Sequence, residues 1–264
     1  MKKNGWLGLT YHALFIAFIL APLVVVIAVS FTSRGYISLP TDGLSLRWFE
    51  AILEQRQFIN AFLMSSWLAF VAATVAIILA VPAALALARY RFPGRSTLMA
   101  FFLSPLMIPH VVMGIAFLRF FNLAGLSGSF GWLSMTHVIV VFPYALRLTL
   151  ASAIGMNRDA ELAARSLGAG PGTVFRRIVL PLIVPGVAGG WMLAFIQSFD
   201  EVTMTIFVAT PGTTTLPVAM YSYISQSIDP LVASVSTVLI VATLIVMVVM
   251  DRLVGLDRVL VGKG

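Results

Sequence analysis

Six long apolar segments dominate this sequence and leave little polar surface for a soluble domain. Of the 264 residues 60% are hydrophobic and 10% are charged, and the mean hydropathy is +1.01. A soluble domain is about half apolar and about a quarter charged. The segments are near or above the ~20 residues that a helix needs to cross a bilayer. The sequence therefore predicts a single all-α integral membrane domain over residues 1–264. The predicted spans are 9–31, 62–88, 98–121, 132–150, 182–208 and 231–250.

The Lys and Arg residues are distributed unevenly between the two sides of this predicted bundle. Thirteen of the 17 fall in the N-terminal residues, the loop at 89–95, the polar stretch at 147–177 and the C-terminal tail. Cytoplasmic loops are enriched in these residue types, so both termini and the polar stretch are expected in the cytoplasm. The net charge of +7 then reports orientation and indicates no nucleic-acid partner. The apolar run after Lys2 and Lys3 is too long for a signal peptide, which favours an uncleaved first helix.

Several chemistries are excluded by residues that the chain lacks. It has no cysteine, which removes disulfides, thiol nucleophiles and thiolate metal sites. Its three lysines, Lys2, Lys3 and Lys263, follow no glycine-rich P-loop pattern. If ATP and Mg drive this protein, a partner chain must bind them. We expect no catalytic residue, metal site or cofactor on this chain.

The connection at 32–61 is the one sizeable segment on the opposite, outer side. Within it, "LSLRWFEAILEQRQFINAF" is typical of an amphipathic helix at a membrane surface. The side chains predicted to face lipid or protein are Trp48, Phe49, Ile52 and Phe58.

The polar stretch between the fourth and fifth spans differs from its surroundings. We expect a short helix over 158–167, capped by Asn157 and ended by Gly168. "GAGPG" then breaks the helix, and Pro181 lies near the start of the next span. The small residues Ala163, Ala164 and Gly168 would let another protein approach this helix closely. The alternative is a solvated loop whose arginines only follow the positive-inside rule.

The spacing in this stretch resembles the cytoplasmic EAA signature of ABC-importer permeases, E-A-A-x-x-x-G-x(9)-I-x-L-P. The matching positions are Ala163, Ala164, Gly168, Ile178, Leu180 and Pro181. In that family the segment is a coupling helix that docks onto a cytoplasmic ATPase subunit. The resemblance implies a coupling segment at 158–181. Its coupling residues would be Glu161, Leu162, Ala163, Ala164, Arg165, Gly168, Ala169 and Pro181.

One position departs from the signature. Aligned on Gly168 and Pro181, the family's glutamate falls on Leu162, and Glu161 lies one residue early. Because a helix turns by about 100° per residue, Glu161 should point elsewhere. We therefore expect docking to be kept and Glu161→Ala to be mild compared with a change at Gly168, and the ion pair that the family's glutamate makes is left open.

The likeness extends along nearly the whole chain. "LSPLMIPHVVMGIAFL" and "GWMLAFIQSFDEVTMTIFVATPGTTTLPVAMYS" are similar to spermidine/putrescine-type permease subunits. That family implies a type I ABC-importer (MetI-like) permease fold with six transmembrane helices in the bacterial inner membrane. It also implies a second permease subunit (a homologous, different chain), two ATPase subunits, a periplasmic substrate-binding protein and surrounding lipid.

Two acids, Asp200 and Glu201, fall inside the predicted fifth span. A charge there costs at least ~2.5 kcal/mol on insertion scales, so it should face a partner or a water-filled path. On one continuous helix, Glu201 would share a polar stripe with other side chains, and an acidic stripe would favour a cationic substrate such as a polyamine. The stripe is Gln197, Ser198, Asp200, Glu201 and Thr205. The alternative is that one acid pairs with Arg119 and the other is protonated or bonds a neighbouring span.

Other polar groups in the spans are weaker candidates. We expect His110, His137 and Tyr144 to be interhelical hydrogen-bonding residues rather than ligands, although Tyr144 could line the pathway. No pair of them has metal-binding spacing. Pro105, Pro109 and Pro143 should kink their spans.

Two other classes of protein share single features with this sequence. "GLSG" around Ser127 matches the G-x-S-G of rhomboid-type serine proteases, but a turn-rich outer loop is a poor place for a buried nucleophile. An ion- or proton-coupled secondary transporter could use Asp200 or Glu201. Such a carrier would not need an ATPase-docking helix, whereas the permease would require its ATPase partner.

Overall fold

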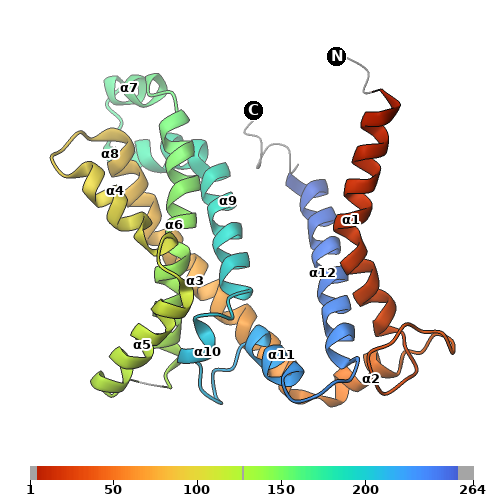
Figure 1. The fold of residues 1–264 in the computed structure, drawn as a ribbon. Coiled ribbons are helices and arrows are strands. Elements are labelled where there is room, and N and C mark those ends of the chain that lie inside the picture. The colour runs from red at the N-terminus through yellow and green to blue at the C-terminus, as the bar shows by residue number, and fades with distance from the viewer. Residues whose placement is uncertain (1–4, 127, 255–264) are drawn as a thin grey trace. The chain divides into compact units, whose positions relative to one another are not determined.

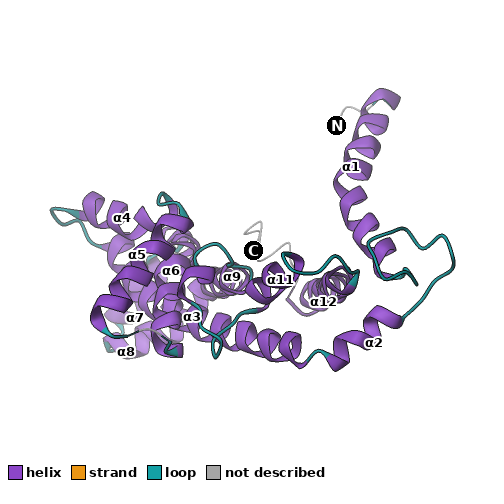
Figure 2. Ribbon diagram, turned by 60° about the horizontal axis from the view of Figure 1, so that its bottom comes forward, coloured by secondary structure: helices purple, strands orange, loops and turns teal. Residues whose placement is uncertain are grey.

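The computed structural model describes residues 5–126 and 128–254, and within these ranges it is built from helices without a β-strand (Figure 1; Figure 2). The expected all-α class is therefore confirmed. Lys2, Lys3, Ser127, Arg258 and Lys263 lie outside the described residues. The first helices are α1 (Trp6–Ser30), α2 (Arg47–Glu54), α3 (Arg56–Arg89), α4 (Arg95–Leu103), the 3-10 turn η1 (Ser104–Leu106), α5 (His110–Ala124) and α6 (Phe130–Gly155). They are followed by α7 (Asp159–Ser166), α8 (Pro171–Val174), the π-helix η2 (Phe175–Val179), α9 (Leu180–Phe199), α10 (Thr205–Val208), α11 (Leu216–Ile224) and α12 (Leu231–Val254).

Several of these helices are long and apolar enough to cross a bilayer. Among the described residues they are α1, α3, α6 and the continuous stretch Pro171–Phe199. A fifth crossing is possible if Arg95–Leu106 and His110–Ala124 form one broken span. In α12, the apolar stretch Leu231–Ile245 is shorter.

The third predicted span is broken rather than merely kinked. Its two halves, Arg95–Leu106 and His110–Ala124, are bent by 94°. Pro105 lies at the start of η1 and Pro109 directly precedes α5. Proline cannot donate a backbone hydrogen bond, and it disfavours helical geometry in the residue before it. Two prolines within five residues therefore end one helix and restart the next. Pro143, by contrast, lies inside the uninterrupted α6.

The chain divides into two compact units. One is Met1–Asn60 with Ala219–Val249, and the other is Ala61–Val218 with Met250–Gly264. In the first unit, the buried Ser234 hydroxyl donates to the Ser30 carbonyl at 3.2 Å, which ties the start of α12 to the end of α1.

The outer connection of the first unit forms two helices that are interrupted at Gln55, not the one amphipathic helix expected. Trp48 and Phe58 are buried, while Phe49 and Ile52 are half-buried. The Trp48 indole donates to the Arg34 carbonyl at 3.2 Å. Both buried aromatic side chains therefore pack against protein.

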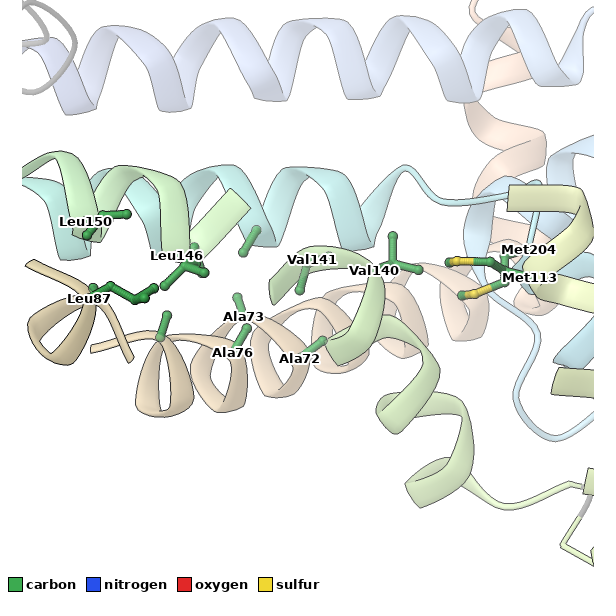
Figure 3. Close-up of a cluster of buried hydrophobic side chains, with 14 residues drawn as sticks. Ala72, Ala73, Ala76, Leu87, Met113, Val140, Val141, Leu146, Leu150 and Met204 are labelled. Atoms are coloured by element: carbon green, nitrogen blue, oxygen red, sulfur yellow. The ribbon is translucent and has the colours of Figure 1, made fainter. Parts of the chain in front are cut away.

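The second unit has a core in which α3 contributes mainly alanines. Ala72, Ala73 and Ala76 are fully buried and face Val140, Val141 and Leu146 of α6 (Figure 3). Small side chains let helix backbones approach closely, as is common between membrane helices.

Glycines of α9 bring it close to α6. A Cβ added at Gly186 would lie 2.6 Å from the Leu148 carbonyl oxygen and would also clash with the Ser152 hydroxyl. One at Gly190 would lie 3.0 Å from the Ala145 carbonyl oxygen. The Gly186–Gly190 spacing is that of small-xxx-small helix pairs. This close pair, α6 and α9, carries the polar stretch between its ends.

Candidate functional site

The polar stretch forms the short helix α7, as the sequence predicted. The N-cap residue is Arg158, which makes no side-chain capping bond, so the expected cap at Asn157 is off by one residue. The Asn157 side-chain oxygen accepts from the Asp159 N–H at 2.9 Å and fixes the turn that leads into the helix. At its end, Gly168 has φ +83°, and the Ala169 N–H donates to the Ala164 carbonyl at 3.0 Å. This left-handed glycine with a bond back across the last turn is a standard helix stop.

One face of α7 presents apolar side chains to the surroundings. Leu162 is 59% exposed and Leu167 is 88% exposed, and Ala163 between them is also exposed. Ala164 and Ala169 are half-buried. In Figure 1, α7 and α8 lie at one end of this unit, and α5 and α10 lie at the other. The arrangement provides a small apolar surface at the end of the α6–α9 pair.

Glu161 points away from this surface, as expected, and forms contacts within the chain. It is buried, and its two oxygens accept from Arg89 Nη2 at 2.7 Å and from Arg165 Nη2 at 2.8 Å. Glu161 therefore forms two ion pairs within this chain, although it lies one residue before the signature position. Arg89 was missed as a partner, because nothing in the sequence brings residue 89 next to residue 161.

The return to α9 passes through an unusual helical turn. After α8, residues Phe175–Val179 form a π-helix that continues into α9, with Pro181 exposed in the first turn of α9. π-turns are rare and are frequent at functional sites. The segment from α7 to Pro181 is thus mostly helical rather than irregular, and most of its side chains are exposed.

The predicted polar stripe on the fifth span is interrupted. Helix α9 ends at Phe199, and Glu201 lies in the break before α10. The expectation that Gln197, Glu201 and Thr205 recur along one helix is therefore wrong. Glu201 Oε1 accepts from the Met204 N–H at 2.7 Å, so the carboxylate caps a new turn instead of continuing the old helix.

Two histidines hold this break in place. His110 Nδ1 lies 2.6 Å from Glu201 Oε2. The fully buried His137 bridges the break, with its ring nitrogens 2.8 Å from the Ser198 hydroxyl and 3.1 Å from the Thr205 hydroxyl. The expectation of interhelical hydrogen bonds is confirmed for His137, whereas His110 contacts Glu201 in the break between two helices. The partner of Glu201 is His110, whereas Arg119 is exposed.

The two acids of this break therefore have different surroundings. Glu201 is 7% exposed and both of its oxygens are engaged, whereas Asp200 is exposed. Gln197 and Tyr144 are half-buried. In the structure, His137 links Ser198 to Thr205 and His110 contacts Glu201. The Asp200 carboxylate stays accessible.

An apolar cavity of about 600 Å³ lies at the bend between α4 and α5. It is lined by aromatic and aliphatic side chains, among them Phe101, Phe142 and Met113. Ser104 is its polar lining residue, and its hydroxyl is already bonded to the Phe101 carbonyl at 2.8 Å. This lining has no acidic side chain that could pair with a cation.

No metal site is found in the described part of the chain, since no three His, Asp or Glu residues cluster there. The features present are apolar helices of spanning length, a helix that projects between two of them, and an acid exposed at a helix break. Together they define an integral membrane protein that carries a short polar helix between two of its spanning helices.

Comparison with known proteins identifies the family. Residues 76–256 match the family of binding-protein-dependent transport system inner membrane components, and the chain belongs to that family. It is a multi-pass protein of the bacterial inner membrane and a permease component of an ABC importer.

Individual relatives and one solved structure agree with this membership. The chain is 32% identical to the spermidine/putrescine transport system permease protein PotC of Haemophilus influenzae, over 96% of this chain and 95% of that protein. It is 32% identical to the putrescine transport system permease protein PotI of Escherichia coli K12, over 87% and 84% of the two chains. A bacterial ABC transporter involved in the import of the acidic polysaccharide alginate contains a similarly folded chain. It has a TM-score of 0.75 at 16% identity, covering 95% of this chain and 96% of that one.

Proposed function

We propose that this chain forms half of a translocation pathway and couples it to ATPase subunits through α7. The observation that carries the proposal is the exposed apolar face of α7, held between α6 and α9. Exposed apolar side chains on a polar helix indicate a protein partner. The docking residues would be Leu162, Ala163, Ala164, Gly168 and Ala169, with Glu161, Arg165 and Pro181 holding the segment in place.

The topology that fits this role has six spans and cytoplasmic termini. The spans would be α1, α3, the bent pair α4–α5, α6, the stretch from α8 to α9, and α12. The charge bias places α7 and the loop at 89–95 on the cytoplasmic side.

The proposed substrate is a polyamine or a related small cation. Two relatives are named as permeases for spermidine or putrescine. The exposed carboxylate of Asp200 could attract an ammonium group, while Glu201 is held by His110 and the Met204 N–H. Gln197, Ser198, Thr205 and Tyr144 would complete the lining of the pathway.

The proposed assembly contains a second, homologous permease chain, two ATPase subunits that bind ATP and Mg, and a periplasmic binding protein. The binding protein would dock on the outer segments 32–61 and 209–228. This chain would carry out no covalent chemistry. It would switch between outward- and inward-facing states as the ATPases close.

The test is purification of the tagged chain from native membranes, followed by reconstitution into proteoliposomes. We expect an ATPase and a second permease to co-purify, and uptake of labelled spermidine or putrescine to require ATP and the binding protein. Uptake by the chain alone, without ATP, would contradict the proposal and favour a secondary carrier that uses Asp200 or Glu201.

A further inference from the structure

Glu161 lies between two arginines that belong to different helices. Arg165 is four residues further along α7, so its bond to Glu161 stays within that helix. Arg89 is the last residue of α3 and is 72 residues away in the sequence. The Glu161 carboxylate therefore joins α7 to a helix with which it has no direct chain connection. We call the Arg89–Glu161 pair the α7–α3 clamp.

The clamp is shielded from water and is supported by a second contact. The Glu161 side chain is 9% exposed and that of Arg89 is 19% exposed. Ion pairs with low exposure are less screened than surface pairs. Beside the clamp, Arg158 Nη2 donates to the Ala88 carbonyl at 3.1 Å. The first turn of α7 is thus fastened to the last turn of α3 at two adjacent points.

A second buried polar contact lies at Ser65, in the other half of α3 and inside its N-terminal end at Arg56. The Ser65 hydroxyl accepts from the Leu216 N–H at 2.7 Å, and both residues are buried. Leu216 begins α11 and follows the loop 209–215, which belongs to the proposed docking surface for the binding protein. From Ser65 to Arg89 a helix rises about 36 Å, at about 1.5 Å per residue. One helix therefore connects α7 to the end of this outer loop.

We infer that Arg89 and Glu161 are positioning residues that make α3 move with α7, so that α3 carries movement between the coupling helix and Leu216. This inference rests on the proposed coupling role of α7. The chain itself already joins α7 to α6 and, through α8, to α9. Helix α3 has no such covalent link, and the clamp supplies the connection.

The first test measures ATP hydrolysis of the assembled complex with and without loaded binding protein. Arg89→Gln and Glu161→Gln should each lower the stimulation about fivefold or more, the usual lower range of coupling between sites. The double variant should be no worse than Glu161→Gln alone, since Glu161→Gln already removes the Arg89–Glu161 pair. Co-purification of the ATPase should persist, because Leu162 and Ala163 are unchanged.

Matched controls are available at neighbouring positions. Arg91→Gln changes an exposed arginine just past the same end of α3, and Asp159→Asn changes an exposed acid on α7. Both should keep normal stimulation. Arg165→Gln removes the bond within α7 but leaves the clamp, so its loss should be smaller than that of Arg89→Gln. An equal or larger loss would show that Glu161 acts inside α7 and would overturn the inference.

The second test starts from a chain in which the clamp is intact, so its first measurement does not depend on the folding of a clamp variant. Because the natural chain has no cysteine, spin labels can be placed at Arg91→Cys and Ala160→Cys alone. The distance between the labels should stay the same in the resting and the ATP-bound complex, and should change or broaden when Glu161→Gln is added. A distance that changes with ATP in the chain without Glu161→Gln would refute the clamp, even if the ATPase co-purifies. Failure of the ATPase to co-purify would refute the proposed coupling itself.

Discussion

The chain leaves its helical path both before and after α9, and the two breaks are built differently. Before α9, Gly168 has φ +83° and Pro171 starts α8, so the backbone itself ends one helix and begins another. After α9, the break at 200–204 contains neither glycine nor proline. It depends on Glu201 and on the bridging His137, whose partners lie on other elements. Local residue types determine the first break, and contacts between helices determine the second.

The difference predicts how each break responds to mutation. A left-handed residue other than glycine costs about 1–2 kcal/mol, so the first break is sensitive at a single backbone position. Leaving a buried hydrogen-bonding group without its partner costs about 1–3 kcal/mol, so the second break is sensitive at either partner. Mutations at the break before α9 should affect coupling to the ATPase. Mutations at the break after α9 should affect the stability of the fold and the pathway.

The largest effect is expected for Gly168→Leu, which should reduce binding-protein-stimulated ATP hydrolysis to the basal level. The added side chain opposes the positive φ and projects beside the proposed docking face. Gly170→Leu is the matched control, because Gly170 has φ −68° and also has open space around its Cβ. Normal stimulation in the Gly168 variant, or an equal loss in the Gly170 variant, would contradict the assigned role.

Glu201→Ala should come next and should destabilise the detergent-solubilised protein by about 3 kcal/mol, since it leaves His110 and the Met204 N–H without their partner. The measurement is the midpoint of denaturant unfolding. Asp200→Ala, one residue away and exposed, should stay within about 0.5 kcal/mol of the natural chain. Similar losses for the two variants would remove the distinction between these acids.

A smaller and more selective effect is expected for Asp200→Asn. Loss of the accessible carboxylate should lower uptake of a polyamine about tenfold, which corresponds to about 1.4 kcal/mol of lost interaction. Assembly with the ATPase should not change. Uptake kinetics equal to those of the natural chain would show that Asp200 does not contact the substrate.

The smallest effect is expected for Asn157→Ala, which removes the side-chain hydrogen bond to the Asp159 N–H at the start of α7, at a cost of about 1 kcal/mol. Amide hydrogen exchange in the first turn of α7 should become about fivefold faster. Ser166→Ala changes another exposed polar residue of the same helix and should leave that turn unaffected. Unchanged exchange in the Asn157 variant would mean that tertiary contacts alone, including the α7–α3 clamp, hold the helix start.

Features with local causes could be predicted from the sequence. The apolar helices, the start of α7 just after Asn157 and the end of α7 at Gly168 follow from residue type and spacing. The 94° bend was underestimated, because the pattern shows that Pro105 and Pro109 interrupt a helix but not how far the chain then turns. Arg89 as the partner of Glu161, and Glu201 as a cap beyond α9, could not be predicted. Both depend on which helices pack together, and a single sequence does not contain that information.

The alanine face of α3 has a mechanical consequence. Alanine has no side-chain rotamers, so a surface made of Ala72, Ala73, Ala76, Ala80 and Ala84 can shift against α6 without any of its own side chains changing conformation. Small sliding movements of packed helices are a known route of conformational change. A leucine-rich face would interdigitate and resist such sliding. Helix α3 is thus held by buried polar contacts at Ser65 and Arg89, and the alanine face between them can slide along α6. This combination suits a helix that transmits displacement along its axis.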